Sequence, residues 1–400
     1  MAWQLVLLTL LSLGAVNYAN LDCVLDFQND FDTSNPLPII LRDNKLLNPD
    51  PNTCSVVLPE GSKILIGCPG DTNSIMYMQP HGRIDTGLKQ LEASCNGGSN
   101  FISSNSLLDS FALKEISCKE QPKVTVRKTT KCGKDNQHQT YQCGYTIGNV
   151  FVWAFESCYD ERLYIPSHVK YEIRPHTCTP APTAPSGNIL TGLLEGLLGI
   201  VLYILSAVFN VLTSLVAQKA RFIELFGTEL ADVYLRDDNL EPCYLANPFY
   251  FATVAEQSVT THYVNLAPQW KSVTESLESL QQGVQNYVNQ GQNSLTVFSG
   301  TIGVLTLPTS LGSSRALYLV TFLGSNVCPV PQYFYKVVIA DHGPLVFLIS
   351  NSIAAVPSGV PFCTDLGSDA HSGISWNRKR SFDLCCDFEE FQKKVSYLQF

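Results

Sequence analysis

The chain has 400 residues, of which 45% are hydrophobic, so it is long enough to bury one large core or two smaller ones. Its formal net charge of -9 at pH 7 argues against a broad polyanion-binding surface, because such surfaces usually carry an excess of Lys and Arg. Any affinity for nucleic acid must therefore come from a local cluster of cations.

The N-terminus has the pattern of a targeting segment. Residues 3–16, WQLVLLTLLSLGAV, form an apolar run of signal-peptide length, and small residues follow where cleavage is expected. We therefore predict a signal peptide over residues 1–19 and a secreted, extracellular protein. Because no Lys or Arg precedes the apolar run, an uncleaved anchor is the alternative.

Fourteen cysteines follow this segment, an even number that suits an oxidising compartment. A disulfide framework is expected, although the sequence leaves its pairing open. The absence of a C-x-x-C pair argues against a zinc site. The adjacent Cys385 and Cys386 are expected to reach different partners.

The first part of the chain, residues 20–122, contains short β segments separated by Pro, Gly and Asn, which predicts a cysteine-rich β region. From residue 123 the segments KVTVRKTT, HQTYQCGYTI and NVFVWAFESCY alternate apolar and polar residues, as half-buried strands do. A Pro-rich linker is expected at residues 177–188.

A long apolar helix is predicted next, over residues 189–221. Its central residues, 197–217, carry no charge and are numerous enough to span a bilayer. Three interpretations remain open: a single-pass transmembrane span, a helix associated with a membrane surface, and a helix buried in protein. Nine cysteines precede the helix and five follow it, so if all pair, one bridge joins the two sides in one oxidising space, which disfavours the span.

Helical periodicity returns at residues 221–235 and 272–290; in the second segment Val273, Leu277, Leu280 and Val284 share one face. The strand-like segments SLTVFSGTIGVLTL, ALYLVTFLG, YFYKVVIAD and LVFLISNS follow. This order predicts an α+β fold with a mostly antiparallel sheet.

Three separated segments, TTHYVNLAPQW, LTVFSGTIGVLTLP and VPQYFYKVVI, resemble the DNA/RNA non-specific endonuclease family in order and spacing. The resemblance covers residues 123–400 and is strongest to the secreted insect branch, which includes double-stranded RNA nucleases. It implies a ββα-metal (His-Me finger) fold and Mg²⁺-dependent cleavage of DNA or RNA.

In that family a strand ends in Arg-Gly-His before Leu-Ala, and the His is the general base that activates water. Aligned without a gap on Leu245 and Ala246, this base position is occupied by Tyr244. The Asn that opens the Asn-x-x-Pro-Gln segment matches Asn265, and the Gln of that segment matches Gln269, so these two residues are predicted remnants of the substrate or metal shell.

The family's metal-ligating Asn aligns with Thr274, and its helical Glu aligns with Gln281 when one deletion is allowed. Neither offers a charge to a hard cation. A tyrosine with a pKa near 10 is a tyrosinate in only about one molecule in a thousand at pH 7, whereas a histidine near 6.5 is a competent base. His262 is expected to point away from Asn265, and His168 to be a solvated surface imidazole.

These replacements predict an endonuclease-like protein that has lost catalysis and binds nucleic acid, weakly, or a protein partner, with no metal ion held. One alternative is a divergent Mg²⁺-dependent endonuclease. The other is a membrane-associated interaction protein that works through residues 197–217.

Overall fold

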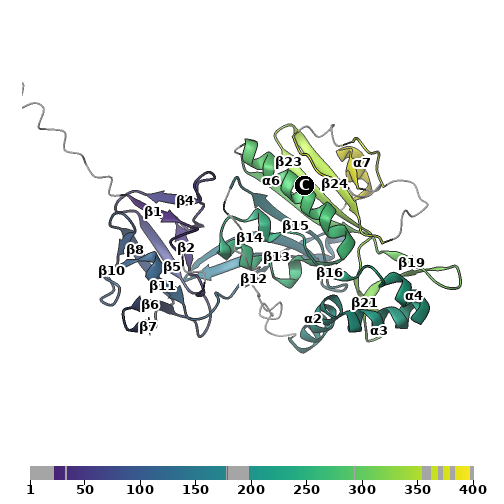
Figure 1. The fold of residues 1–400 in the computed structure, drawn as a ribbon, viewed down its shortest axis with the longest axis horizontal. Helices are drawn as coiled ribbons and strands as arrows, with labels where there is room; N and C mark the ends of the chain where they lie inside the picture. Colours follow the sequence, from purple (N-terminus) through teal and green to yellow (C-terminus); the bar gives the residue numbers. More distant parts are fainter. Residues whose placement is uncertain are drawn as a thin grey trace, which may run out of the picture.

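The computed structural model describes residues 22–31, 34–176, 178, 198–291, 293–353, 362–367, 373–378 and 383–396 (Figure 1). The predicted signal peptide and almost all of the predicted linker lie outside these residues. Within them the chain is a mixed α+β protein, and every strand pair in its sheets is antiparallel, which confirms the predicted fold class.

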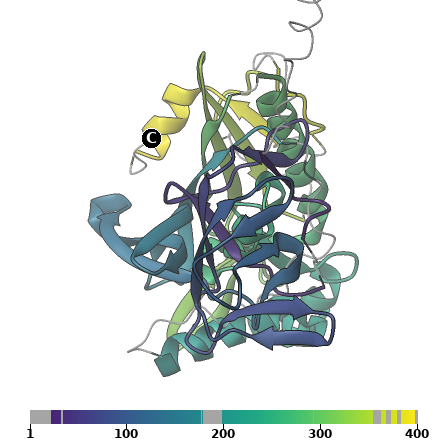
Figure 2. The ribbon, with the colours of Figure 1, turned by 90° about the vertical axis from the view of Figure 1, so that its left-hand side faces the viewer.

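The N-terminal part is a set of short strands around a small core of its own, and it faces the viewer in Figure 2. Alternation along β8 turns Leu91, Ala93 and Cys95 inward. Two disulfides, Cys23–Cys95 and Cys68–Cys118, lie within it. The three sheets contain β1 (Cys23–Asp26) and β4 (Ser55–Leu58); β10 (Ser110–Ala112), β9 (Asn100–Ile102), β8 (Gln90–Cys95), β5 (Lys63–Gly67), β2 (Ile39–Arg42) and β3 (Lys45–Leu46); and β11 (Ile116–Cys118), β6 (Ile75–Gln79) and β7 (Gly82–Asp85).

The second part is built on an eight-stranded sheet whose strand order follows the chain, apart from three strand pairs that lie outside the sheet. These pairs are β16 (Leu240–Tyr244) with β17 (Leu266–Trp270), β19 (Thr306–Pro308) with β20 (Ser314–Ala316), and β21 (Tyr318–Phe322) with β22 (Ser325–Pro329). The strands predicted from residue 123 onward are present in the structure. Their sequences either alternate apolar and polar residues or carry apolar residues on both faces, and both patterns suit a strand that buries side chains. In order across the sheet the strands are β12 (Thr125–Cys132), β13 (His138–Ile147), β14 (Val150–Asp160), β15 (Ile165–Ile173), β18 (Leu295–Ile302), β23 (Tyr333–Ala340), β24 (Gly343–Ser350) and β25 (Leu384–Cys386).

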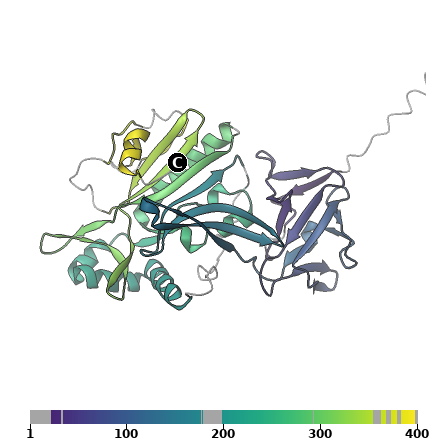
Figure 3. The same cartoon turned by 180° about the vertical axis from the view of Figure 1, so that it is seen from behind.

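The two faces of this sheet are covered unequally. The helix α6 (Thr274–Gly291) packs Leu280, Val284 and Val288 into the main core, which includes Val297 of β18. The neighbouring Phe298 points to the other face, where it shares a smaller cluster with Phe391 of the short helix α7 (Phe388–Lys394). As seen from behind, α7 lies over one end of the sheet and leaves the β12 to β15 end without a helix (Figure 3).

The predicted single helix over residues 189–221 is two helices in its described portion, which is a correction. α2 (Leu198–Thr213) ends at Ser214, whose hydroxyl accepts a hydrogen bond from the Ala217 amide and so caps α3 (Leu215–Phe226). A further helix, α4 (Thr228–Tyr234), follows Gly227. Buried side chains of α2, among them Ile204 and Val208, pack into the main core. Among the described residues, no helix combines the length and apolarity needed to cross a membrane.

The disulfides correct the parity argument, because not all cysteines pair. Five bridges form and none crosses α2; four buried thiols, Cys143, Cys243, Cys328 and Cys385, stay free. Cys386 pairs with Cys363, and Cys132 with Cys158.

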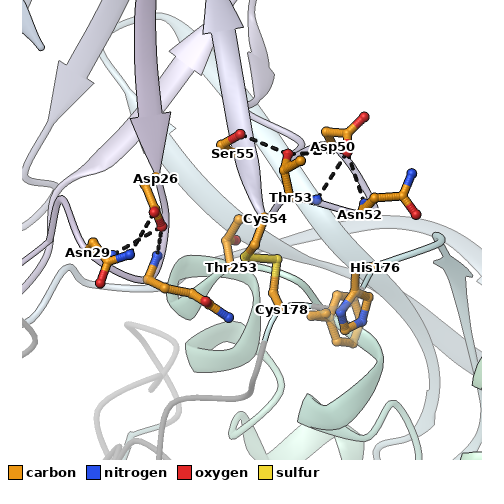
Figure 4. Close-up of a disulfide and its surroundings, with 12 residues drawn as sticks. Asp26, Asn29, Asp50, Asn52, Thr53, Cys54, Ser55, His176, Cys178 and Thr253 are labelled. Carbon is orange, nitrogen blue, oxygen red and sulfur yellow. Dashed lines mark hydrogen bonds between the residues drawn. A yellow bond between two sulfur atoms is a disulfide. The ribbon is translucent and has the colours of Figure 1, made fainter. Parts of the chain in front are cut away.

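The bridge Cys54–Cys178 joins the N-terminal part to the chain just after β15, beside the buried His176 ring and Thr253 (Figure 4). Ile39 and Leu41 of β2 also pack into the main core together with Ile147. The division into domains at residue 122 therefore stays a prediction, since the two parts share covalent and apolar contacts.

Candidate active site

A strand, strand and helix unit carries Tyr244, Gln269, Thr274 and Gln281, and Asn265 lies directly before its second strand. β16 (Leu240–Tyr244) pairs with β17 (Leu266–Trp270), which places Tyr244 opposite Leu266 and Glu241 opposite Gln269. The turn η5 (Lys271–Val273) then leads directly into α6, which begins at Thr274. The short connections hold the strand ends beside the first turns of the helix, which is the ββα order that the resemblance implies.

Tyr244 ends β16 and is half-buried against the main core. Burial, and to a smaller extent the neighbouring Cys243, raises the pKa of its phenol above the ordinary value of 10. Among the described residues its hydroxyl has no hydrogen-bond partner. At pH 7 an even smaller fraction of Tyr244 is therefore ionised than of a solvated tyrosine, so less of the basic form is available.

The cavity beside Tyr244 is small, with a volume of about 20 Å³. Polar and apolar side chains both form its wall, and the polar ones include Tyr244, Gln281, Ser299, Tyr335 and Lys336. A single water molecule needs roughly 10–15 Å³ measured in this way, so the cavity holds about one water. A nucleotide does not fit in it.

Asn265 lies between these strands with its side chain fully buried, and its amide is bonded entirely to the backbone. Its Nδ2 donates to the carbonyls of Ala246 (2.9 Å) and Thr260 (2.7 Å), and its Oδ1 accepts from the Ala246 amide (2.7 Å). Asn265 thus ties the end of β16 to the turn before β17. Both polar atoms of the Asn265 side chain are therefore already hydrogen-bonded to backbone and are not directed toward a ligand.

Gln269 and Thr274 lie together around one carboxylate that the sequence had not singled out, Glu241. The Gln269 Nε2 donates to Glu241 Oε1 (2.9 Å) and to Thr274 Oγ1 (3.0 Å), and the Thr274 hydroxyl donates to the same Glu241 oxygen. The Gln269 Oε1 is buried and has no hydrogen-bond partner among the residues that the structure describes. Sequence reasoning missed Glu241 because only the strand register places it directly opposite Gln269.

These residues do not fit the Mg²⁺ ion that the family implies. Mg²⁺ requires several oxygen ligands in near-octahedral arrangement. Here hydrogen-bond donors face the Glu241 carboxylate, the amide of Asn265 is fully used, and Gln281 lies apart from Glu241 as a wall of the small cavity. We therefore derive no chemical step through a metal ion.

Lys336 of β23 is a buried cation next to this unit that sequence analysis missed. Its Nζ donates to the hydroxyls of Tyr171 (2.7 Å) and Ser299 (2.6 Å) and lies 4.9 Å from the ring centroid of Tyr250. Burial lowers the pKa of the amine to about 7. The available signal was a lysine in YFYKVVIA, a segment whose other residues suit a strand buried on both faces.

Two histidines considered from the sequence, His262 and His168, are both placed by the structure. His262 is buried at the start of the turn η4 (Tyr263–Asn265), where its Nδ1 accepts from the Val264 amide. His168 lies on β15 rather than in a solvated turn, so that expectation is wrong. Burial, together with His138 and Lys170, lowers the pKa of His168 to about 4 and keeps the ring neutral at pH 7.

The comparisons with known proteins agree with this unit. A family model described as DNA/RNA non-specific endonuclease matches residues 246–389. The chain is 24% identical over 387 residues to a salivary endonuclease of Lutzomyia longipalpis, covering 93% of this chain and 83% of that protein. It is 22% identical over 390 residues to the salivary protein Tsal2A of Glossina morsitans morsitans, covering 90% of this chain and 88% of that protein.

Among solved structures, the crystal structure of the EndoG/EndoGI complex is similar with a TM-score of 0.31 and 13% identity, covering 62% of this chain and 82% of that chain. A likeness at that score carries no argument about the arrangement of this protein. The family match spans β17, α6 and the strands that follow. Together with the two relatives, it shows that this chain is similar to the DNA/RNA non-specific endonuclease family over residues 246–389.

Proposed function

We propose that this protein is a secreted member of the endonuclease family that binds nucleic acid without cleaving it. The observation that carries the proposal is Tyr244 at the position of the general base, with a phenol whose pKa is raised by burial. General-base assistance contributes about 10²- to 10⁴-fold to such reactions, and a protonated phenol does not supply it.

The arrangement of the metal-shell residues supports the same proposal. Thr274 and Gln269 are hydrogen-bonded to Glu241, and Asn265 is bonded to backbone. Loss of the base and of the cation ligands together removes both the activation of water and the stabilisation of the scissile phosphate.

Nucleic acid is the favoured ligand because cations gather locally in a chain of net charge -9. β12 and the turn after it carry Arg127, Lys128, Lys131 and Lys134 within eight residues, and all four side chains lie at the exposed edge of the large sheet or in that turn. Such a cluster is where phosphate binding is expected when the whole surface is acidic.

Secretion is supported by three observations. Five disulfides require an oxidising compartment. Both relatives are described as salivary. The apolar run in residues 3–16 has the length of a signal peptide.

The test is a paired assay of cleavage and binding with the full chain. Labelled DNA and RNA are incubated with the protein and millimolar Mg²⁺, with and without EDTA, and binding is followed by fluorescence anisotropy. We expect the labelled DNA and RNA to stay intact both with and without EDTA. We also expect the anisotropy to rise to saturation as protein is added. EDTA-sensitive cleavage that Tyr244→Phe abolishes would overturn the proposal.

Residual hydrolysis is a second candidate, favoured by Lys336. This amine lines the same small cavity as Tyr244, and its pKa of about 7 lets the neutral form accept a proton at physiological pH. Cleavage by this route would rise through a midpoint near pH 7 and disappear in Lys336→Met. A rate that is indifferent to Lys336→Met would exclude it.

A further inference from the structure

A second cavity lies on the face of the large sheet that α6 does not cover. Its volume is about 260 Å³, just below the range of roughly 300–1,000 Å³ typical of small-molecule sites. We call it the β12–β15 hollow; its wall includes Thr130, Lys131, Thr140, Glu156, Lys170 and Phe298.

The strand register shows on which face of the sheet the hollow lies. Lys170 pairs with Phe298 and Glu156 pairs with Lys170, so these three side chains share one face of the sheet. Phe298 belongs to the cluster that α7 covers, whereas the alternate residues Val169 and Val297 belong to the core under α6. The hollow therefore opens on the side of the sheet opposite the α6 core, and it shares no lining residue with the small cavity beside Tyr244.

The walls of the hollow present hydrogen-bond donors. Thr130 and Thr140 supply hydroxyls, and Asn136 supplies an amide from the turn after β12. That turn is shaped by left-handed backbone at Gly133 (φ 75°), Asp135 (φ 55°) and Asn136 (φ 54°). The turn closes one end of the hollow and brings Asn136 to its wall.

The charge inside the hollow is positive at pH 7. Among the described residues, no carboxylate lies within salt-bridge distance of the amines of Lys131 or Lys170. The one acid in the wall, Glu156, accepts a hydrogen bond of 2.6 Å from the Gln142 amide. His168 is neutral because burial lowers its pKa to about 4. Two cations therefore face one anion that is already hydrogen-bonded.

Two rings lie beside the cations, the half-buried His168 ring and the buried Phe298 ring. The amine of Lys170 lies 5.6 Å from the centroid of the Phe298 ring, and the His168 ring lies 6.1 Å from it. Ammonium groups and hydroxyls recognise phosphate oxygens, and flat rings next to them suit a nucleobase. The volume also exceeds what a single phosphate group needs.

We propose that the β12–β15 hollow binds a nucleotide unit of single-stranded nucleic acid, with its phosphate held between Lys131 and Lys170. This inference rests on the proposed function and gives that function a location away from the degenerate active site. Two other cations of β12 are already engaged within the protein, since Arg127 stacks on the Phe151 ring at 3.9 Å and Lys128 pairs with Glu161. The contact is therefore expected to centre on Lys131 and Lys170.

An alternative role for Lys131 is to protect the exposed edge strand β12 against pairing with other chains, which needs charge but no ligand. That role does not apply to Lys170, which lies on the interior strand β15. The experiment separates the two roles. The full chain is titrated into a fluorescein-labelled single-stranded oligonucleotide, and the anisotropy is compared for the wild type, Lys131→Gln and Lys170→Gln. Lys114→Gln, an exposed lysine of the N-terminal part, is the control of matched charge.

Each hollow variant is expected to weaken binding about 5- to 10-fold and to reduce the salt dependence, log Kd against log salt, by about 0.7. The control is expected to stay within about twofold of the wild type, since it lies away from the hollow. Unchanged thermal melting shows that the variants fold. Wild-type affinity in both hollow variants would overturn the inference alone, whereas an absence of binding by the wild type would overturn the proposed function with it.

Competition identifies the group that is recognised. We expect 5′-AMP to displace the oligonucleotide, inorganic phosphate to do so only at higher concentration, and adenosine to fail. Displacement by adenosine equal to that by 5′-AMP would show that phosphate is not recognised and would reject the hollow as a phosphate site. Equal displacement by inorganic phosphate would reject the nucleotide in favour of a simple anion site.

Discussion

The two faces of the eight-stranded sheet differ in what they leave accessible. On the α6 face the family's catalytic positions are filled by Tyr244, whose cavity measures about 20 Å³, and by Asn265, whose amide is bonded to backbone. On the opposite face the β12–β15 hollow measures about 260 Å³ and presents Lys131 and Lys170. This difference supports the proposal that the strand, strand and helix unit is kept as packing, while the charge that a ligand needs lies on the opposite face.

The largest expected effect concerns Asn265, because it decides whether this residue is packing or a ligand contact. Asn265→Ala removes three hydrogen bonds from a fully buried position and leaves backbone groups unpaired. We expect the free energy of unfolding to fall by about 3 kcal/mol or more in urea denaturation. The exposed Asn286→Ala on α6 is the control, with a change within about 0.5 kcal/mol. A stable Asn265→Ala that no longer binds nucleic acid would make Asn265 a ligand contact.

The second-largest expected effect concerns the disulfide Cys54–Cys178, which joins the two parts of the molecule. Cys54 and Cys178 are 124 residues apart, and Cys54→Ala with Cys178→Ala is expected to lower the free energy of unfolding by about 2–4 kcal/mol. Because neither cysteine lines the hollow, oligonucleotide affinity is expected to stay at the wild-type level. A loss of oligonucleotide affinity in a double variant that still folds would show that the N-terminal part contributes to binding.

The buried amine of Lys336 gives the α6 face a pH dependence. Its folded-state pKa of about 7 lies below the unfolded value near 10.5, so between these values the unfolded chain binds the additional proton. Stability should therefore rise with pH over that window by at most about 1.4 kcal/mol per pH unit from this group. Lys336→Met should lack this contribution, and denaturation of both proteins from pH 7 to 10 measures the difference. A constant difference across the window would contradict the shifted pKa.

The smallest expected effect is at Tyr244. Because its hydroxyl has no partner among the described residues, Tyr244→Phe is expected to change the free energy of unfolding by no more than about 0.5 kcal/mol. Oligonucleotide affinity should also be unchanged, in contrast to Lys170→Gln. A lower oligonucleotide affinity in Tyr244→Phe would show that the α6 face takes part in ligand binding.

Local patterns predicted much of this fold. The alternation in HQTYQCGYTI and the helical spacing of Leu280 and Val284 identify β13 and α6, because each pattern reports which side chains the element buries. The break at Ser214 was missed because a single capping serine is a weak signal inside an apolar run. The free thiols were missed because parity alone cannot distinguish a buried thiol from a bridge.

The sites depended on contacts between distant segments. The alignment located Tyr244 and Asn265 but not the backbone bonds that occupy Asn265, which involve Ala246 and Thr260. Glu241 and Lys336 acquire their surroundings only when strands far apart in the chain pair or pack. The β12–β15 hollow combines side chains from β12 to β18, and no sequence spacing connects Lys131 with Phe298.

Calorimetric titration of Mg²⁺ and Mn²⁺ into the full chain tests most directly whether the catalytic centre is degenerate. Because Glu241 is faced by hydrogen-bond donors and Asn265 is fully bonded, we expect only heats of dilution up to millimolar metal. Saturable binding of one metal ion per chain, lost in Thr274→Ala or Glu241→Gln, would contradict the account.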